Sequence, residues 1–281
     1  MRPRRYYAGP VKGMDEEQRV TRMAKAIIAT AAEYIDTHED FSEIVKRRPT
    51  DVTRKIDLEA EKALDNAILR EGIRARVISE ELGERIVPSE SQPECTLVLD
   101  PIDGSMNSIS GIPYFCTSLA MALKDRDATF GDVEAAAVAS IASGTFSAKR
   151  NNGAKRNDTP IKVRENREKP RYGLYTYNAG PIPRGVIALQ EERCVVRTMG
   201  SIALDLCMLA WGSLDAVVDT RNKLSGYDIM AGVLILQEAG GVITDAQGRP
   251  FSGMPVTATG LSIIAAASKE RHELLLSKLS A

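Results

Sequence analysis

This 281-residue chain contains an acidic turn, Asp100-Pro-Ile-Asp-Gly-Ser105, directly after the apolar run Cys95–Leu99, and this turn limits the possible folds more than any other segment. A short apolar run of this kind predicts a buried strand, and the proline presets the turn that ends it. The two aspartates stand three positions apart, so both carboxylates can reach one cation. Hard ions such as Mg²⁺ prefer oxygen ligands drawn from several segments. The turn therefore predicts a metal site at the end of a buried strand.

The residues that end the turn indicate an anion site beside the metal. Gly104 allows a close approach of the backbone, and Ser105-Met-Asn107 can open a helix. The free N–H groups at the start of a helix point at an anion. The same turn therefore predicts a phosphate cradle.

Other acidic residues stand at the edges of predicted elements: Asp57, the pair Glu80-Glu81 after Val77-Ile78-Ser79, and Asp228 ahead of an apolar helical stretch. Each alone is ordinary, because an acid at a helix start is usually a cap and one at a strand end is usually solvated. Their joint occurrence with the Asp100 turn favours one site built from several segments.

Composition excludes several classes of protein. Apolar residues make up 43% and charged residues 27% of the chain, which is typical of a compact globular protein. The net charge is -1, so no overall field attracts nucleic acid or an anionic membrane. The basic start Met1–Arg5 lacks the apolar stretch of a secretory signal, and no segment has the length of a membrane span. We expect a frayed tail over residues 1–14 and a soluble, cytoplasmic protein without nucleic-acid or membrane partners.

Cysteine and histidine offer little catalytic material. The cysteines are far apart and form no CxxC pair, which favours buried core thiols over a zinc or redox site. Neither histidine lies near another candidate ligand, which weakens any triad with a histidine base. These residues are Cys95, Cys116, Cys194, Cys207, His38 and His272.

The hydrophobic pattern predicts an N-terminal half in which helices precede strands. Apolar residues at helical spacing indicate helices over 15–37 and 54–70, separated by an exposed basic loop over 41–53 that contains Pro49. Short apolar runs predict strands at 76–79 and 95–99. Small and apolar residues over 117–124 and 133–149, broken at Gly144, predict antiparallel strands.

A polar stretch over 150–171, with Pro160 and Pro170, predicts a boundary between two halves. We expect an N-terminal α+β half over 15–160 that carries the metal-binding motifs and a C-terminal α/β half over 161–281 that completes the active site. The expected elements of the second half are helices at 202–210, 227–239 and 269–279, and strands at 215–218, 242–244 and 263–267.

Together these segments resemble the Mg²⁺-dependent, lithium-sensitive inositol monophosphatase-like phosphatases, and most closely the archaeal members that also act on fructose 1,6-bisphosphate. The likeness spans most of the chain from about residue 20 onward. It implies a layered αβαβα sandwich of the sugar phosphatase type, of mixed α+β and α/β class. The motifs that carry it are Asp51-Val-Thr-x-x-x-Asp57, Ser79-Glu-Glu-Leu-Gly83, Asp100-Pro-Ile-Asp-Gly-Ser-x-Asn107, Gly200-Ser-Ile-Ala-Leu-Asp-Leu-Cys207, Leu214-Asp-Ala-Val-Val-Asp219 and Tyr227-Asp-x-x-Ala-Gly232 ahead of Glu238-Ala-Gly-Gly241.

The resemblance implies two to three Mg²⁺ ions, for which Mn²⁺ can substitute. It assigns Glu80, Asp100, the Ile102 carbonyl and Ser105 to one ion, Asp100, Asp103 and Asp228 to a second, and Asp57 to a weaker third. The phosphate would lie on the Gly104 and Ser105 amides, and a metal-activated water would attack phosphorus without a covalent phosphoenzyme. The implied catalytic residues are Asp57, Glu80 and Ser105; the implied substrate-binding residues are Asp103, Gly104, Ser105, Ser201, Asp219, Arg221 and Asp228.

The sequence departs from the family pattern in a few places. Ser105 and Met106 stand where threonines are common, and Tyr227 replaces a frequent tryptophan. The gap between Asp219 and Asp228 is longer than in the animal inositol enzymes and holds Arg221 and Lys223, which is closer to the archaeal type.

Substrate choice depends on that gap. Asp219 would suit a polyol hydroxyl, whereas Arg221 and Lys223 either meet a second phosphate or remain solvated loop charges. Tyr172, Tyr175 and Tyr177 either line the pocket mouth or enter the core. We expect hydrolysis of myo-inositol 1-phosphate, fructose 1,6-bisphosphate or both. The resemblance to the family implies a homodimer. Two alternatives stay open: a 3′-phosphoadenosine 5′-phosphate phosphatase, and a catalytically silent regulatory homologue.

Overall fold

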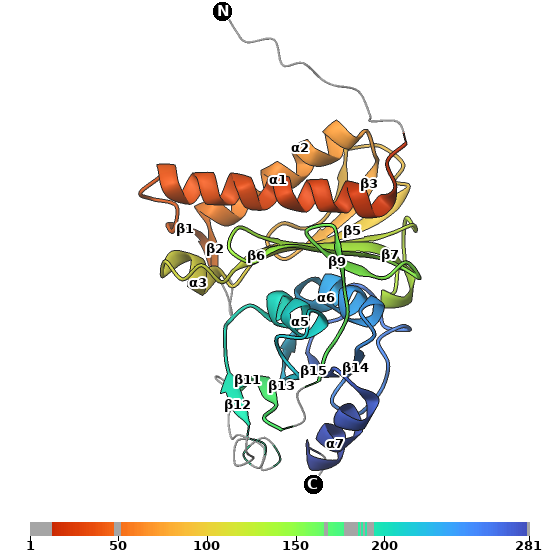
Figure 1. Cartoon of the computed structure of the whole chain (residues 1–281). Coiled ribbons are helices and arrows are strands. Elements are labelled where there is room, and N and C mark those ends of the chain that lie inside the picture. The colour runs from red at the N-terminus through yellow and green to blue at the C-terminus, as the bar shows by residue number, and fades with distance from the viewer. Residues whose placement is uncertain are drawn as a thin grey trace, which may run out of the picture.

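The computed structural model arranges the chain in five alternating layers of helix and sheet (Figure 1). It describes residues 13–47, 52–165, 168–176 and 194–279, with the single positions 185, 187 and 189. Among the described elements, two helices cover the first sheet, two more lie between the sheets, and one helix covers the outer face of the second sheet. The predicted αβαβα sandwich is confirmed.

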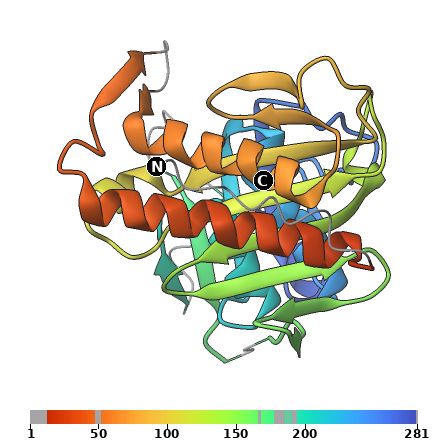
Figure 2. The same ribbon diagram turned by 90° about the horizontal axis from the view of Figure 1, so that it is seen from above.

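The first layer consists of α1 (Glu16–Thr37) and α2 (Lys55–Glu71), which lie side by side across the sheet in the view from above (Figure 2). Helix α1 begins at a reciprocal cap, in which Gln18 N–H donates to the Asp15 carboxylate at 2.9 Å. Helix α2 ends at Gly72, whose φ of 66° is the left-handed conformation that commonly closes a helix. Both helices were predicted to within one residue.

The second layer is an eight-stranded sheet in the order β10-β9-β8-β7-β6-β5-β3-β4. Strand β3 pairs parallel with β5 and every other pair is antiparallel. All nine residues of β5 are buried, because α2 packs on one face and α6 on the other. Its strands are β3 (Ala75–Ser79), β4 (Gly83–Val87), β5 (Cys95–Asp103), β6 (Cys116–Ala122), β7 (Val133–Ser140), β8 (Gly144–Lys149), β9 (Ala154–Arg156) and β10 (Thr159–Ile161).

The remaining layers come from the second part of the chain. Helices α5 (Ile202–Ala210) and α6 (Gly226–Glu238) pack against each other, and α6 also packs on β5–β8. The second sheet has the order β12-β11-β13-β15-β14, and α7 (Lys269–Leu279) covers β15 and β14. Its strands are β11 (Arg171–Tyr175), β12 (Val195–Arg197), β13 (Ala216–Leu224), β14 (Val242–Thr244) and β15 (Leu261–Ala266).

The expectation of a loop over 41–53 was wrong, and the expected boundary segment contains strands that were not predicted. The predicted loop over 41–53 contains β1 (Ile44–Arg47) and β2 (Val52–Arg54), which pair antiparallel, although β1 is largely exposed. The predicted boundary over 150–171 contains β9 and β10, which extend the first sheet. The charged residues of these segments suggested loops, but edge strands also tolerate charged side chains, so composition did not reveal either strand pair. Residues 1–12, 48–51 and Tyr177 lie outside the described residues.

One hydrophobic core joins the two parts of the chain. It includes Val98 and Phe146 of the first sheet together with Leu206 of α5 and Leu234 of α6. Helices of the second part thus help to build the core of the first sheet. The division at residues 160 and 161 stays a prediction. Among the described helices, none combines the length and apolar character needed to cross a membrane.

Candidate metal centre

The Asp100 turn ends β5 and starts the short helix α3 (Ser105–Ile109). Gly104 adopts a φ of 91°, and a Cβ there would meet the Tyr114 carbonyl oxygen at 3.0 Å and the Gly200 carbonyl oxygen at 3.2 Å. Only glycine tolerates both conditions. Thr117 Oγ1 donates to the Pro101 carbonyl at 2.8 Å, which ties the turn to β6. The turn is therefore packed closely against the Tyr114 and Gly200 carbonyl groups and is hydrogen-bonded to Thr117.

Three carboxylates from three elements converge beside this turn. One oxygen from each of Glu80, Asp100 and Asp228 lies within 4.8 Å of the other two. The parallel pairing of β3 with β5 brings Glu80 beside Asp100, and Glu80 N–H donates to the Leu99 carbonyl at 3.2 Å. Asp228 comes from the first turn of α6, where it accepts from Ser225 N–H at 2.6 Å. This acidic triad has the oxygen donors and the spacing that a hard divalent cation requires.

The electrostatics of the triad favour a bound cation. Burial, together with the carboxylates of Glu80, Asp103 and Asp228, raises the pKa of Asp100 well above its usual range. Burial also raises the pKa of Asp228 to about 7. Like charges in a buried site disfavour ionisation unless positive charge is supplied. The residues present therefore fit a metal ion.

Asp103 lies close enough to the triad to raise the pKa of Asp100, but its own carboxylate is hydrogen-bonded to another element. Its carboxylate accepts from Ser201 Oγ at 2.6 Å, Ala203 N–H at 2.7 Å and Ile202 N–H at 3.2 Å, all at the start of α5. Burial raises the pKa of Asp103 to about 6, although these hydrogen bonds act to lower it. Asp103 thus joins the two parts of the chain. Ser201, predicted to bind substrate, uses its hydroxyl for this contact.

The other predicted ligands are Asp57, Ile102 and Ser105, and each has contacts within its own segment. Asp57 lies buried in the first turn of α2, where its carboxylate accepts from Arg54 N–H at 2.7 Å. Ile102 N–H donates to Asp100 at 3.0 Å, and Ser105 begins α3. None of these residues belongs to the acidic triad, and their roles as ligands stay predictions.

A pocket of about 590 Å³ opens beside the triad. Its lining includes Arg221 from the end of β13, whose guanidinium forms a fork with the carboxylate of Asp219, with the Nη2–Oδ2 distance at 2.6 Å. Asp219 is fully buried, and Arg221 also lies 5.0 Å from the centroid of the Tyr175 ring. Asp219 therefore positions Arg221 at the pocket wall. Lys223 lines the same pocket.

A buried acid that was not predicted from the sequence, Asp205, contacts Tyr175 of the pocket lining. Asp205 of α5 accepts from Tyr114 Oη at 2.6 Å and from Tyr175 Oη at 2.8 Å. Burial raises the pKa of Asp205 to about 7. The signal was available, since Asp205 is the one charged residue within the apolar run Ile202–Ala210. Tyr172 is also buried, so both described tyrosines of β11 enter the core, and Tyr175 reaches the pocket as well.

No cysteine or histidine belongs to the acidic triad among the described residues, although Cys116 Sγ lies 3.8 Å from an Asp103 carboxylate oxygen. Cys95, Cys116 and Cys207 are buried free thiols, as predicted, and Cys194 is partly exposed. His272 is buried near Thr244, with 3.0 Å between Nε2 and Oγ1, and His38 stacks on Tyr34.

Known proteins share this architecture and sequence. The fructose-1,6-bisphosphatase/inositol-1-monophosphatase of Methanothermobacter thermautotrophicus is 33% identical, over 92% of this chain and 94% of that protein. The fructose-1,6-bisphosphatase of Pyrococcus furiosus is 36% identical, over 85% and 89%. A solved Pyrococcus horikoshii protein, described as having similarities to inositol-1 monophosphatase, superposes with a TM-score of 0.75 at 31% identity, over 92% and 95%.

Two further relatives have names of other kinds. A bifunctional NADP phosphatase/NAD kinase of Methanococcus maripaludis is 32% identical over 70% of this chain and 37% of its own length. A Nus factor SuhB of Pasteurella multocida is 30% identical over 92% of each protein. Residues 16–281 match the inositol monophosphatase family as a whole. The fold, the acidic triad and these matches agree, and the chain belongs to the inositol monophosphatase family.

Proposed function

We propose that this protein is a Mg²⁺-dependent phosphomonoesterase that hydrolyses myo-inositol 1-phosphate and fructose 1,6-bisphosphate. The observation that carries the proposal is the acidic triad of Glu80, Asp100 and Asp228 at the edge of a pocket of about 590 Å³. A site of this kind suits an anionic substrate only when a cation offsets the carboxylates. The family relationship supports the same chemistry.

The proposed metal centre holds two to three Mg²⁺ ions, and Mn²⁺ can replace them. Glu80, Asp100 and Asp228 form its core, and the Ile102 carbonyl, Ser105, Asp103 and Asp57 complete the ligand sets. When bound, the metal supplies Lewis-acid chemistry that polarises phosphate oxygens and makes water a better nucleophile.

The protein's own groups position the substrate. Gly104 lets the phosphate approach the backbone, and we propose that the phosphate accepts from the N–H groups of Gly104 and Ser105, where α3 begins. Asp219 holds Arg221 in the pocket lining, so we propose that Arg221 meets a distal phosphate while Asp219 acts through it. Lys223 adds positive charge to the same lining. This arrangement supports a sugar bisphosphate as a substrate.

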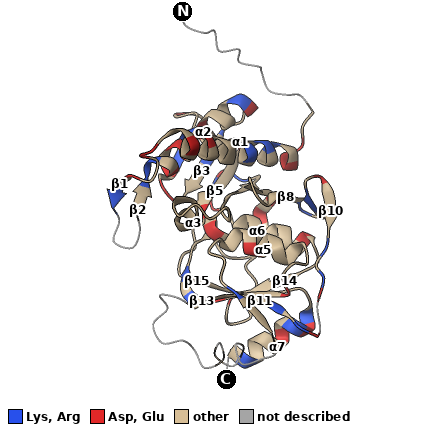
Figure 3. Cartoon of the chain, turned by 60° about the vertical axis from the view of Figure 1, so that its left-hand side comes forward, with Lys and Arg blue, Asp and Glu red and all other residues tan. Residues whose placement is uncertain are grey.

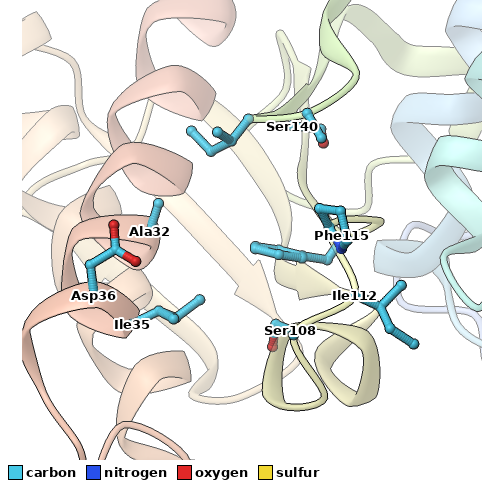
Figure 4. Close-up of a pocket in the computed structure, with 11 residues that line it drawn as sticks. Ala32, Ile35, Asp36, Ser108, Ile112, Phe115 and Ser140 are labelled. Atoms are coloured by element: carbon cyan, nitrogen blue, oxygen red, sulfur yellow. The ribbon is translucent and has the colours of Figure 1, made fainter.

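We further propose that the protein acts in the cytoplasm as a homodimer. A groove of about 240 Å³ between α1 and the segment after α3 is lined by apolar side chains, including Ile35 and Phe115 (Figure 4). At its rim, Ile112 and Ile141 are 49% and 61% exposed. Exposed apolar groups gathered in this way are typical of protein contacts. Light scattering coupled to size exclusion tests the dimer, and a monomeric mass at micromolar concentration would contradict it.

A nucleotide phosphatase is the second candidate. The relative named a bifunctional NADP phosphatase/NAD kinase supports this candidate. The pocket of about 590 Å³ is also large enough for part of a nucleotide. The third candidate, a silent regulatory homologue, gains support from the relative named Nus factor SuhB. The complete acidic triad favours an active enzyme over a catalytically silent homologue.

A phosphate-release panel separates these candidates. The purified protein is given myo-inositol 1-phosphate, fructose 1,6-bisphosphate, 3′-phosphoadenosine 5′-phosphate and NADP, each with Mg²⁺ or with a chelator. We expect Mg²⁺-dependent release from the first two. Strong preference for a nucleotide would select the second candidate, and no turnover of any compound would select the silent homologue.

A further inference from the structure

A second pocket, of about 560 Å³, lies away from the metal centre. It is formed by the β9–β10 hairpin, the residues that follow β10, and Trp211 at the end of α5. Figure 3 shows blue, basic residues on this hairpin beside the β10 label. The pocket shares no lining residue with the pocket at the acidic triad, so it is a separate feature.

The charged side chains that line this pocket are all basic. They are Arg156, Lys162 and Arg164, and no carboxylate lines the pocket with them. Within the described part of the chain, the side chains of Lys162 and Arg164 form no ion pair and no hydrogen bond. Cations gathered in a concave site without counter-charge repel one another and attract an anion. The neutral donors Asn157 and Thr159 lie beside them.

Packing holds two of these cations in place. Arg156 donates from Nε and Nη2 to the Ser143 carbonyl, at 3.0 and 2.8 Å, and its guanidinium lies 3.9 Å from the centroid of the Trp211 ring. The Arg164 stem packs over Gly212, where a Cβ would lie 2.8 Å from the Arg164 Cβ. Side chains held in this way lose less entropy when they bind a ligand.

A structural role accounts for only part of this cluster. The carbonyl groups at the end of α5 favour a nearby cation, and Arg164 beside Gly212 can satisfy that preference. The preference is worth at most about 1 kcal/mol at an exposed site and falls off within one turn. It therefore leaves Lys162, on the hairpin side of the pocket, unexplained.

We propose that this basic pocket binds a small anion with two or more linked phosphate groups. A single phosphate monoester carries about two negative charges at neutral pH, so three cations match a diphosphate better than a single phosphate. The pocket, at about 560 Å³, also has room for more than an inorganic ion. A nucleoside diphosphate and inorganic pyrophosphate share this chemistry.

Trp211 reports directly on the pocket, because it is the only tryptophan of the chain. The full-length protein is titrated with pyrophosphate and, separately, with ADP, in a chelator that keeps metal from the acidic triad, while tryptophan fluorescence is recorded. We expect a saturable change in fluorescence with at least one ligand. Comparison of the two affinities shows whether the inorganic or the nucleoside diphosphate is preferred.

Charge reversal locates the binding. The double variant Lys162→Glu/Arg164→Glu should bind about 100-fold more weakly, because each lost charge-assisted contact costs about tenfold. Lys25→Glu, an exposed change on α1, and Asp100→Asn, in the acidic triad, should bind like the unchanged protein. The proposal is overturned if fluorescence does not saturate, if sodium chloride of equal ionic strength gives the same change, or if the double variant binds equally well.

Discussion

Asp205 shows how one buried side chain couples pH to stability. It is fully buried against Tyr114 and Tyr175, and burial raises its pKa from 3.8 to about 7. The folded protein therefore holds this proton more tightly than the unfolded chain, so its contribution is complete below pH 4 and is lost as pH rises toward 7. The loss amounts to at most roughly 4 kcal/mol.

We predict that Asp205→Asn flattens this part of the pH dependence. Urea unfolding of the variant and the unchanged protein, each at pH 5 and pH 8 in chelator, gives the change in the free energy of unfolding between the two pH values. This change with pH is the slope that is compared between the two proteins. Glu39→Gln, an exposed control on the surface, should leave the slope unchanged. Equal slopes for Asp205→Asn and the unchanged protein would show that the carboxyl ionises normally in the folded state.

Thr53 holds the acid that follows Glu80. Its hydroxyl donates to Glu81 at 2.5 Å, and Thr53 and Glu81 are both buried. Thr53→Val keeps the shape but removes the donor, which should cost about 1–3 kcal/mol. Thr53→Ser keeps the donor and should cost less. Urea unfolding with chelator present measures both, and a larger loss for the serine variant would contradict the hydrogen-bond argument.

At the scale of elements, the turn between β5 and α3 depends on Gly104. Its φ of 91° and its contacts with two carbonyl oxygens both oppose a side chain. We predict that Gly104→Ala lowers the free energy of unfolding by about 2–4 kcal/mol and reduces phosphate release at least tenfold. Thermal unfolding and phosphate release check the two effects separately.

Gly111 provides the matched control for this turn. Its φ of 71° is also left-handed, but a Cβ there would meet nothing within 4 Å. Gly111→Ala should therefore incur only the backbone cost, about 1–2 kcal/mol. If the two alanine variants lose equal stability, close packing around Gly104 is not the reason for its glycine.

Local patterns predicted most elements well. The 3.6-residue period of α1 and the apolar run of β5 are properties of neighbouring residues, so both elements emerge from the sequence. The β1–β2 pair and the β9–β10 pair did not emerge, because their exposed charges match a loop as well as an edge strand. Pairing of such strands is decided by the partner strand rather than by their own composition.

For the whole molecule, the proposed metal ties the two parts of the chain together. Glu80 and Asp100 come from the first sheet, whereas Asp228 comes from α6. The unfolded chain does not hold these ligands together, so Mg²⁺ at 100 times its dissociation constant should stabilise the fold by about 2.7 kcal/mol. Thermal unfolding with and without Mg²⁺ measures the shift.

Asp100→Asn is the matched variant for this prediction. It removes a carboxylate from the centre of the triad and so should abolish the Mg²⁺-induced shift and phosphate release. Without metal it should be at least as stable as the unchanged protein, because one buried like charge is gone. A full Mg²⁺ shift in this variant would refute the triad as the metal site.

Local patterns in the sequence were enough to predict the long described helices, many of the strands and the acids of the triad, because periodicity and acids at element edges are properties of neighbouring residues. The contacts that these acids make depend instead on the folded arrangement. Asp103 meets Ser201, a residue 98 positions away, and Arg221 turns toward Asp219 rather than into solvent. The basic pocket, too, exists only where β10 meets the end of α5. Such contacts depend on how the layers stack, and no window of neighbouring residues contains that information.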